Sequence, residues 1–301
     1  MNEVQSLSVA DPKLGIPGTI LMTSILRCTL AALAFASTVW LAATPAMADD
    51  FESCAKASGD EAIAACTRAI NSGRYDDPKL AVLLKNRCVE WNKKQESDKA
   101  IEDCSQAIQL KPDFAQALSN RGGAYMFKDE YDRAIEDYDQ AVRLDPDDAD
   151  AFNNRGIVHS LKGQYDRSIE DFNQAIRLDP RYAMAFTNRG RAFQLKGQYD
   201  RAIEDLDLAI RLNPNYELAF YNRGAAYSLK GQYDRSIEDF DQAIRLNPNY
   251  ARAFYDRALS WERKSDLQRA LADFKKFSEL APSDPDGPTA VERVTKALNR
   301  R

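Results

Sequence analysis

The chain has 301 residues, of which 44% are hydrophobic and 29% charged, so it has enough apolar surface for a core and enough charge to stay soluble. Its 46 acidic and 41 basic side chains leave a net charge of −5, and the basic residues form no patch that would bind phosphates, which argues against nucleic acid as a partner. The single histidine, His159, limits acid–base chemistry and metal ligation, so we expect no metal site and no cofactor.

Residues 1–48 are predicted to be an N-terminal extension and a signal peptide. Arg27 precedes an apolar stretch over 28–43, and the small-residue ending Ala46-Met47-Ala48 is typical of a secretory cleavage site. Cleavage after Ala48 would make the protein periplasmic or secreted. The alternative is an uncleaved anchor over 28–48, membrane-anchored and facing the periplasm, which would be its only contact with a membrane.

The start of the chain leaves a further alternative. Both Met1 and Met22 could be the first residue, and the leader pattern begins at Met22. A chain that starts at Met1 and stays in the cytosol would be an intracellular adaptor with reduced cysteines.

Prolines mark an internal repeat after the leader. They recur every 34 residues, at Pro112, Pro146, Pro180, Pro214, Pro248 and Pro282. Counting back from each proline gives six copies, at 81–114, 115–148, 149–182, 183–216, 217–250 and 251–284. A period of this length is typical of stacked helix–turn–helix units.

Each copy has the pattern of two packed helices. A small residue stands on the first helix, four positions after an apolar anchor: Cys88, Gly122, Gly156, Gly190, Gly224 and Ala258. The second helix offers a mostly large residue: Cys104, Tyr138, Phe172, Leu206, Phe240 and Phe274. Small residues that face large ones let two helices approach closely. Because no strand-like alternation follows Asp49, the predicted fold class is all-α.

Glycines and prolines punctuate the helices. Gly163, Gly197 and Gly231 fall between the two helices of a copy, where a left-handed residue commonly ends the first helix. The repeat prolines end the second helix, because proline cannot continue one. The sequence therefore predicts a helical hairpin in each copy.

The repeat resembles the tetratricopeptide family over residues 81–284, in its period and in a recurring Asn-Arg-Gly at 120–122, 154–156, 188–190 and 222–224. The resemblance implies a right-handed α–α superhelix, or solenoid, whose concave groove binds other proteins or peptides. The chain departs from the family where arginine replaces leucine: Arg87, Arg121, Arg155, Arg189, Arg223 and Arg257. We interpret these arginines as partners of second-helix aspartates: Asp103, Asp137, Asp171, Asp205, Asp239 and Asp273.

Both ends of the repeat array are predicted to be caps, since a solenoid must cover its terminal apolar faces. Residues 49–80 resemble a degenerate N-terminal repeat. Residues 285–301 are predicted to form a C-terminal capping helix that begins with a capping box from Thr289 to Glu292.

Four cysteines near the N-terminus suggest two disulfides. Cys66 aligns with Cys104 between copies, and Cys54 aligns with Cys88 if the early copy lost one helical turn. The alignment selects Cys54–Cys66 and Cys88–Cys104 among three connectivities, and export would favour their oxidation. The first alternative is that the four cysteines are buried thiols of the core. The second is a zinc site, which the spacing of the cysteines does not favour.

The predicted groove residues lie on the first helices. A row of asparagines, Asn86, Asn120, Asn154, Asn188 and Asn222, could bond peptide backbone, because an amide both donates and accepts. It resembles the asparagine row in the superhelix of O-linked N-acetylglucosamine transferase; bonds within neighbouring helices are the structural alternative. Tyr221, Tyr255 and Arg191 are predicted to face the same groove and to hold an aromatic or acidic group of the ligand.

We expect an exported, non-catalytic scaffold that holds an extended peptide segment or loop of another protein in its groove. The alternative is a structural subunit of a cell-envelope complex that uses its convex or terminal faces. No phosphate-binding glycine loop or nucleophile motif is present in the sequence, so we do not expect an enzyme.

Overall fold

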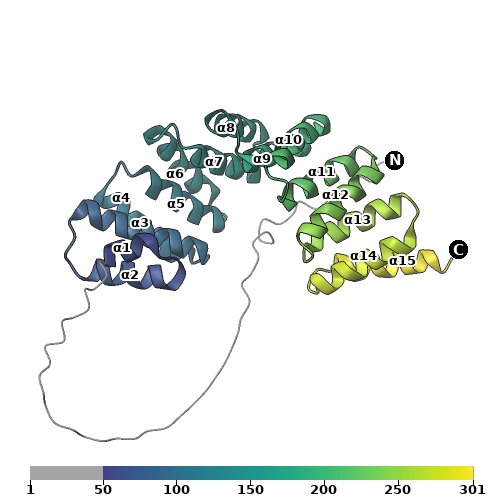
Figure 1. Cartoon of the computed structure of the whole chain (residues 1–301), viewed down its shortest axis with the longest axis horizontal. Helices are drawn as coiled ribbons and strands as arrows, with labels where there is room; N and C mark the ends of the chain where they lie inside the picture. The colour runs from purple at the N-terminus through teal and green to yellow at the C-terminus, as the bar shows by residue number, and fades with distance from the viewer. Residues whose placement is uncertain (1–49, 301) are drawn as a thin grey trace, which may run out of the picture. The chain divides into compact units, whose positions relative to one another are not determined.

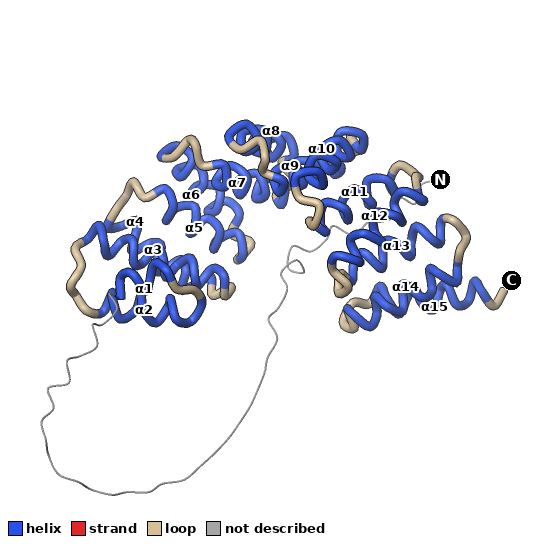
Figure 2. The backbone as a smooth tube through the Cα atoms, viewed as in Figure 1, coloured by secondary structure: helices blue, strands red, loops and turns tan. Residues whose placement is uncertain are grey.

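In a computed structural model of the chain, residues 50–300 are described, and they fold into fifteen α-helices without a β-strand (Figure 2). The predicted leader and its cleavage site lie outside the described residues. The helices are α1 (Asp50–Lys56), α2 (Gly59–Asn71), α3 (Asp77–Lys93), α4 (Ser97–Leu110), α5 (Ala115–Phe127), α6 (Tyr131–Leu144), α7 (Ala149–Leu161), α8 (Tyr165–Leu178), α9 (Ala183–Leu195), α10 (Tyr199–Leu212), α11 (Glu217–Leu229), α12 (Tyr233–Leu246), α13 (Ala251–Arg263), α14 (Leu267–Leu280) and α15 (Asp286–Leu298).

Consecutive helices pack in pairs, and the pairs stack in chain order (Figure 1). The first helices of neighbouring pairs also contact one another, α3 with α5 and so on to α11 with α13. We call the surface formed by α3, α5, α7, α9, α11 and α13 the first-helix face. The predicted all-α solenoid is therefore confirmed.

Tight packing inside each hairpin follows from the small residues of the first helix. A Cβ atom built on Gly156 would lie 2.7 Å from the Phe172 ring, and one on Gly224 would lie 3.0 Å from the Phe240 ring. Both rings are buried, which confirms the predicted small-against-large contact. Without these glycines, α7 and α11 could not lie so close to their partners.

A left-handed residue ends the first helix in several hairpins. Gly163 has φ of 70°, and the next amide, of Gln164, donates to the His159 carbonyl at 2.8 Å. This hydrogen bond satisfies a carbonyl at the end of α7, and the left-handed residue redirects the chain toward the start of α8. Asp129 and Ser265 adopt the same conformation at the equivalent positions, at φ of 60° and 63°.

The recurring arginines join each hairpin internally and to the hairpin before it. In all six copies the guanidinium contacts the predicted aspartate of its own second helix, with Nη2 to Oδ1 distances of 2.6–2.7 Å. Its Nη1 reaches the second helix of the preceding pair, as in Arg155 to Asp139 at 2.7 Å and Arg189 to Asn173 at 2.6 Å. The predicted ion pair is confirmed, and it extends to a second partner in the neighbouring hairpin.

Lysines form a second set of links between hairpins. Each lysine after a first helix contacts an aspartate at the start of the preceding second helix: Lys94 with Asp60, Lys128 with Asp98, Lys162 with Asp132, Lys196 with Asp166, Lys230 with Asp200 and Lys264 with Asp234. These aspartate side chains are largely exposed, so each pair contributes little energy by itself, although the pairs repeat along the array.

Helix α3 begins at Asp77, four residues before the first full copy of the repeat, because extended Asp76 precedes it and Pro78 suits its first turn. One helix start differs from the sequence prediction. Helix α15 begins at Asp286, so Thr289 lies inside the helix and donates to the Pro285 carbonyl at 2.8 Å. The predicted capping box from Thr289 to Glu292 is wrong for this reason.

None of the helices within residues 50–300 is both long and apolar enough to cross a bilayer.

Candidate binding face

The asparagine row does not present five equivalent amides. Asn120 donates to the Gln116 carbonyl of its own helix at 2.6 Å, and Asn86 accepts from Lys85 at 2.6 Å. Asn188 donates to the Asn153 side chain on the preceding first helix at 2.9 Å. At these positions the amides make structural hydrogen bonds, as in the alternative interpretation of the row.

The row and its predicted aromatic companion are buried at α11. Asn222 is 1% exposed and Tyr221 is 6% exposed, so the prediction that both face a ligand is wrong for this arrangement. The Tyr221 hydroxyl reaches the next first helix and donates to Asp256 at 2.7 Å, while its ring packs 4.8 Å from that of Tyr250. The Tyr221 side chain is long enough to bridge α11 and α13, and it is therefore buried between them.

Arg191 and Tyr255 remain half-buried on the first-helix face. The positive charge of Arg191 acts on the Tyr221 and Tyr250 hydroxyls, where it partly opposes the burial that raises the pKa of both phenols. The ring of Tyr255 lies against Phe274 and Phe277, at 5.3 and 4.9 Å between centroids. The two residues thus have different neighbours, and their predicted contact with an aromatic or acidic group of a ligand stays a prediction.

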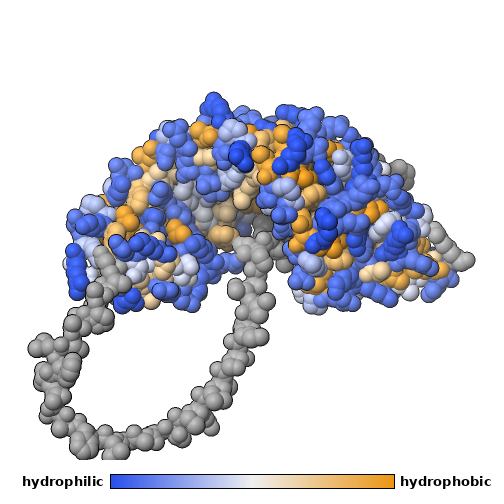
Figure 3. Space-filling view, viewed as in Figure 1, coloured by the Kyte–Doolittle hydropathy of each residue, from blue (hydrophilic) through white to orange (hydrophobic). Residues whose placement is uncertain are grey.

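Exposed apolar side chains, which the sequence reasoning missed, concentrate on the first helices. Phe127 and Met184 are each 44% exposed, Leu195 is 37% exposed and Leu229 is 36% exposed. Phe127, Leu195 and Leu229 each end a first helix and lie 34 residues or twice that apart, so the repeat itself carried the signal. Figure 3 shows that hydrophobic and hydrophilic residues are interspersed on the visible face of the array.

An acidic cavity, also missed from the sequence, opens beside the asparagine row. It has a volume of about 640 Å³ and lies between α5, α7 and the segment before α9. Its lining residues include Asn120, Asn154 and five aspartates, Asp145, Asp147, Asp148, Asp150 and Asp179. The signal in the sequence was the acidic run over 145–150, which the other copies lack.

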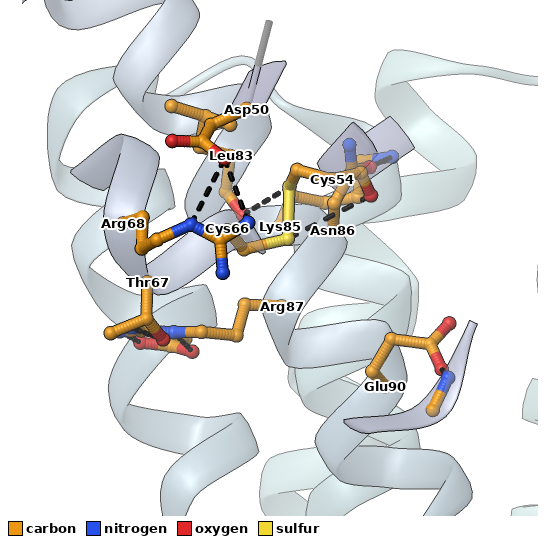
Figure 4. Close-up of a disulfide and its surroundings, with 12 residues drawn as sticks. Asp50, Cys54, Cys66, Thr67, Arg68, Leu83, Lys85, Asn86, Arg87 and Glu90 are labelled. Atoms are coloured by element: carbon orange, nitrogen blue, oxygen red, sulfur yellow. Dashed lines mark hydrogen bonds and ion pairs between the residues drawn. A yellow bond between two sulfur atoms is a disulfide. The ribbon is translucent and has the colours of Figure 1, made fainter. Parts of the chain in front are cut away.

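The four N-terminal cysteines come together in the two predicted pairs. Cys54 is joined to Cys66 across α1 and α2, and Cys88 is joined to Cys104 across α3 and α4, with Cα–Cα distances of 4.6 and 5.7 Å. Figure 4 shows the first pair packed against Leu83 of α3. Buried Glu90, also in Figure 4, accepts from the Gly59 amide at 2.7 Å and so joins α3 to the start of α2.

Family comparisons identify the repeat. Models described as TPR repeat and tetratricopeptide repeat match residues 124–163, 149–182, 172–204, 190–231 and 218–250. Residues 124–250 contain tetratricopeptide repeats. The tetratricopeptide fold is typically a non-catalytic scaffold, and proteins that contain it generally bind other proteins or peptides. No curated protein matches the sequence.

Solved structures show the same fold. The APC/C hetero-tetramer Cut9-Hcn1 matches with a TM-score of 0.68 and 18% identity, over 78% of this chain and 48% of that one, so this chain spans about half the relative's length. A tetratricopeptide repeat protein from Parabacteroides merdae has a TM-score of 0.63 and 18% identity, over 78% and 91% of the two chains. PilF of Pseudomonas aeruginosa has a TM-score of 0.63 and 16% identity, over 73% and 99%. Identities this low establish the fold and carry no function across.

Proposed function

We propose that the protein is an exported, non-catalytic scaffold that binds an extended segment or loop of another protein on its first-helix face. The observation that carries the proposal is the distribution of exposed apolar surface: of the five large hydrophobic residues that are most exposed among the described residues, four lie on first helices and only Leu144 lies on a second helix. Their recurrence on first helices offers apolar contacts to a partner along one side of the array, and apolar surface of this kind is a common feature of protein-binding sites.

The test replaces the exposed apolar side chains that end three first helices. In the variant Phe127→Gln, Leu195→Gln, Leu229→Gln, the helices keep good helix formers, so we expect the fold to survive. The full chain would be expressed in its own host and crosslinked, and captured proteins would be identified by mass spectrometry. We expect a partner that is captured by the wild-type chain and lost in the triple variant.

The matched control is Leu144→Gln, which removes an apolar side chain that is at least as exposed, at 46%, from second helix α6. Capture should be unchanged in this control. Equal capture by all three chains would contradict the proposal and would favour the alternative, a structural subunit that uses its other faces.

Export has its own test, because binding does not depend on it. The leader pattern and the cysteine pairs together motivate a periplasmic or secreted location, where oxidised cysteines persist. We expect the purified protein to begin at Asp49. A mature chain that retains residues 28–48 would instead point to the membrane-anchored alternative.

A further inference from the structure

The acidic cavity lies where the second copy departs from the repeat pattern. The last residue of the 34-residue unit is aromatic at Phe114, Tyr182, Tyr216 and Tyr250, whereas aspartate stands there in the second copy, at Asp148, and in the last copy, at Asp284. Elsewhere the ring fills space between hairpins, as Tyr250 does against Tyr221 at 4.8 Å. The short aspartate leaves that space open, and the resulting cavity is lined by both neighbouring first helices.

The carboxylates of this cavity lack basic partners. Within residues 50–300, the recurring aspartates of the second helices contact arginine or lysine, but none of the five cavity aspartates takes part in an ion pair. Their hydrogen bonds come from neutral donors: Asp148 accepts from the Ala151 amide at 3.1 Å, Asp179 accepts from the Arg181 amide at 2.9 Å, and Asp150 accepts from the Tyr182 hydroxyl. Several negative charges therefore face one concave space without compensation.

Two further features point to an occupant of the cavity. The Ser119 hydroxyl oxygen, on the cavity wall, is buried and has no hydrogen-bond partner among the described residues. Met184, which follows Tyr182 by two residues and is 44% exposed, contacts Asn153 on the neighbouring helix α7. An apolar surface thus lies beside the acidic one on the first-helix face.

We propose that this cavity accepts a lysine or arginine side chain of the bound protein segment, and that an apolar side chain of the same segment rests on Met184. The inference rests on the proposed function and specifies the chemistry of its ligand. A cationic side chain provides several donors for carboxylate oxygens, and charge-assisted hydrogen bonds of this kind are stronger than neutral ones. Uncompensated charge also attracts such a segment at a distance.

Fluorescence anisotropy with labelled model peptides tests the proposal on the full chain. One peptide alternates lysine with leucine and the other alternates glutamate with leucine, both in buffer with EDTA so that a metal ion cannot substitute for the cationic side chain. We expect the lysine peptide to bind and the glutamate peptide not to bind. Raising the NaCl concentration from about 50 mM to about 500 mM should weaken the binding of the lysine peptide, because salt screens partly exposed charges.

The decisive variant is Asp147→Asn, Asp148→Asn, Asp150→Asn. Asparagine is also a good N-cap, so the start of α7 should be preserved. The matched control removes three carboxylates from the exposed faces of second helices, Glu170→Gln, Glu204→Gln, Glu238→Gln. We expect the cavity variant to lose about tenfold or more in affinity for the lysine peptide, a typical effect of unpairing close charges, and the control to bind nearly as the wild type does.

Three outcomes would overturn the inference: no binding of the lysine peptide to the wild type, equal binding of the glutamate peptide, or equal losses in the cavity variant and the control. Its failure is distinguishable from failure of the proposed function. If the crosslinked partner is lost in the Phe127, Leu195 and Leu229 variant but retained in the cavity variant, the face binds a protein and the cavity does not select its charge.

Discussion

Asp256 is a carboxylate at the position where the preceding first helices carry asparagine. It is buried on α13 and accepts a hydrogen bond from Tyr221 at 2.7 Å. Burial raises the pKa of Asp256, although the bond from Tyr221 and the charge of Arg252 oppose the rise. The folded chain therefore binds a proton more tightly than the unfolded chain, whose aspartates titrate near about 3.9, and stability falls as pH rises from that value through the folded pKa.

We predict that Asp256→Asn raises the melting temperature at pH 7, because the amide still accepts from Tyr221 and carries no buried charge. The gain should shrink on acidification toward about pH 4, where the unfolded aspartate also begins to protonate. Circular dichroism melts across this range measure both effects. Asp234→Asn, at an exposed carboxylate paired with Lys264, is the control, and a lower melting temperature for Asp256→Asn at pH 7 would contradict the argument.

Single residues also show where the sequence was sufficient and where it was not. The Arg155–Asp171 pair was predictable, because an arginine and an aspartate recur at the same spacing in every hairpin. The environment of Asn222 was not predictable from the repeat, because it depends on neighbours that vary from copy to copy. Position 221 is tyrosine, whereas the same place holds Ser119, Asn153 and Thr187 in other copies, and the phenol reaches Asp256 on the next first helix.

The two helices of a hairpin pack closely where a glycine of the first helix faces a large side chain of the second. We expect Gly156→Ala to destabilise the protein, because its Cβ would lie 2.7 Å from the Phe172 ring inside a closely packed interface. A typical overpacking cost is about 1–3 kcal/mol, larger than the gain of about 1 kcal/mol from better helix propensity. Chemical denaturation would measure the difference.

Gly123→Ala is the matched control on neighbouring helix α5. Its Cβ would lie 3.5 Å from the Tyr138 hydroxyl, an ordinary contact, so the propensity gain should dominate and the variant should be slightly more stable. Destabilisation by both changes to the same degree would show that helix spacing does not depend on these glycines.

Helix identity was predictable from the period, while helix starts and surface cavities were not. Repetition of small and large residues specifies which faces of two helices meet, and the sequence contains it six times. The start of α15 depends instead on a single local choice between Asp286 and Thr289, for which no repeat gives a second example. The acidic cavity likewise depends on the acidic run over 145–150, which is found only once in the array.

The whole array behaves as a linear stack in which each hairpin is stabilised by its neighbours. Arginine and lysine side chains join adjacent hairpins through the middle of the stack, as Arg223 does with Asp207 and Lys230 with Asp200. The hairpin α1–α2 has a neighbour on one side only among the described residues, so it should open before the interior. Both cysteine pairs lie in this hairpin and the next.

We therefore predict that reduction loosens the N-terminal end selectively. Two disulfides that close loops of 12 and 16 residues stabilise by about 3 kcal/mol each. Hydrogen exchange with and without reductant should show faster exchange over 50–110 and little change over 183–263. The variant Cys54→Ala, Cys66→Ala, Cys88→Ala, Cys104→Ala controls for other effects of the reductant, because its exchange should not respond. Uniform acceleration along the chain would mean that the hairpins unfold together, and an unchanged pattern would mean that packing alone holds the first two hairpins.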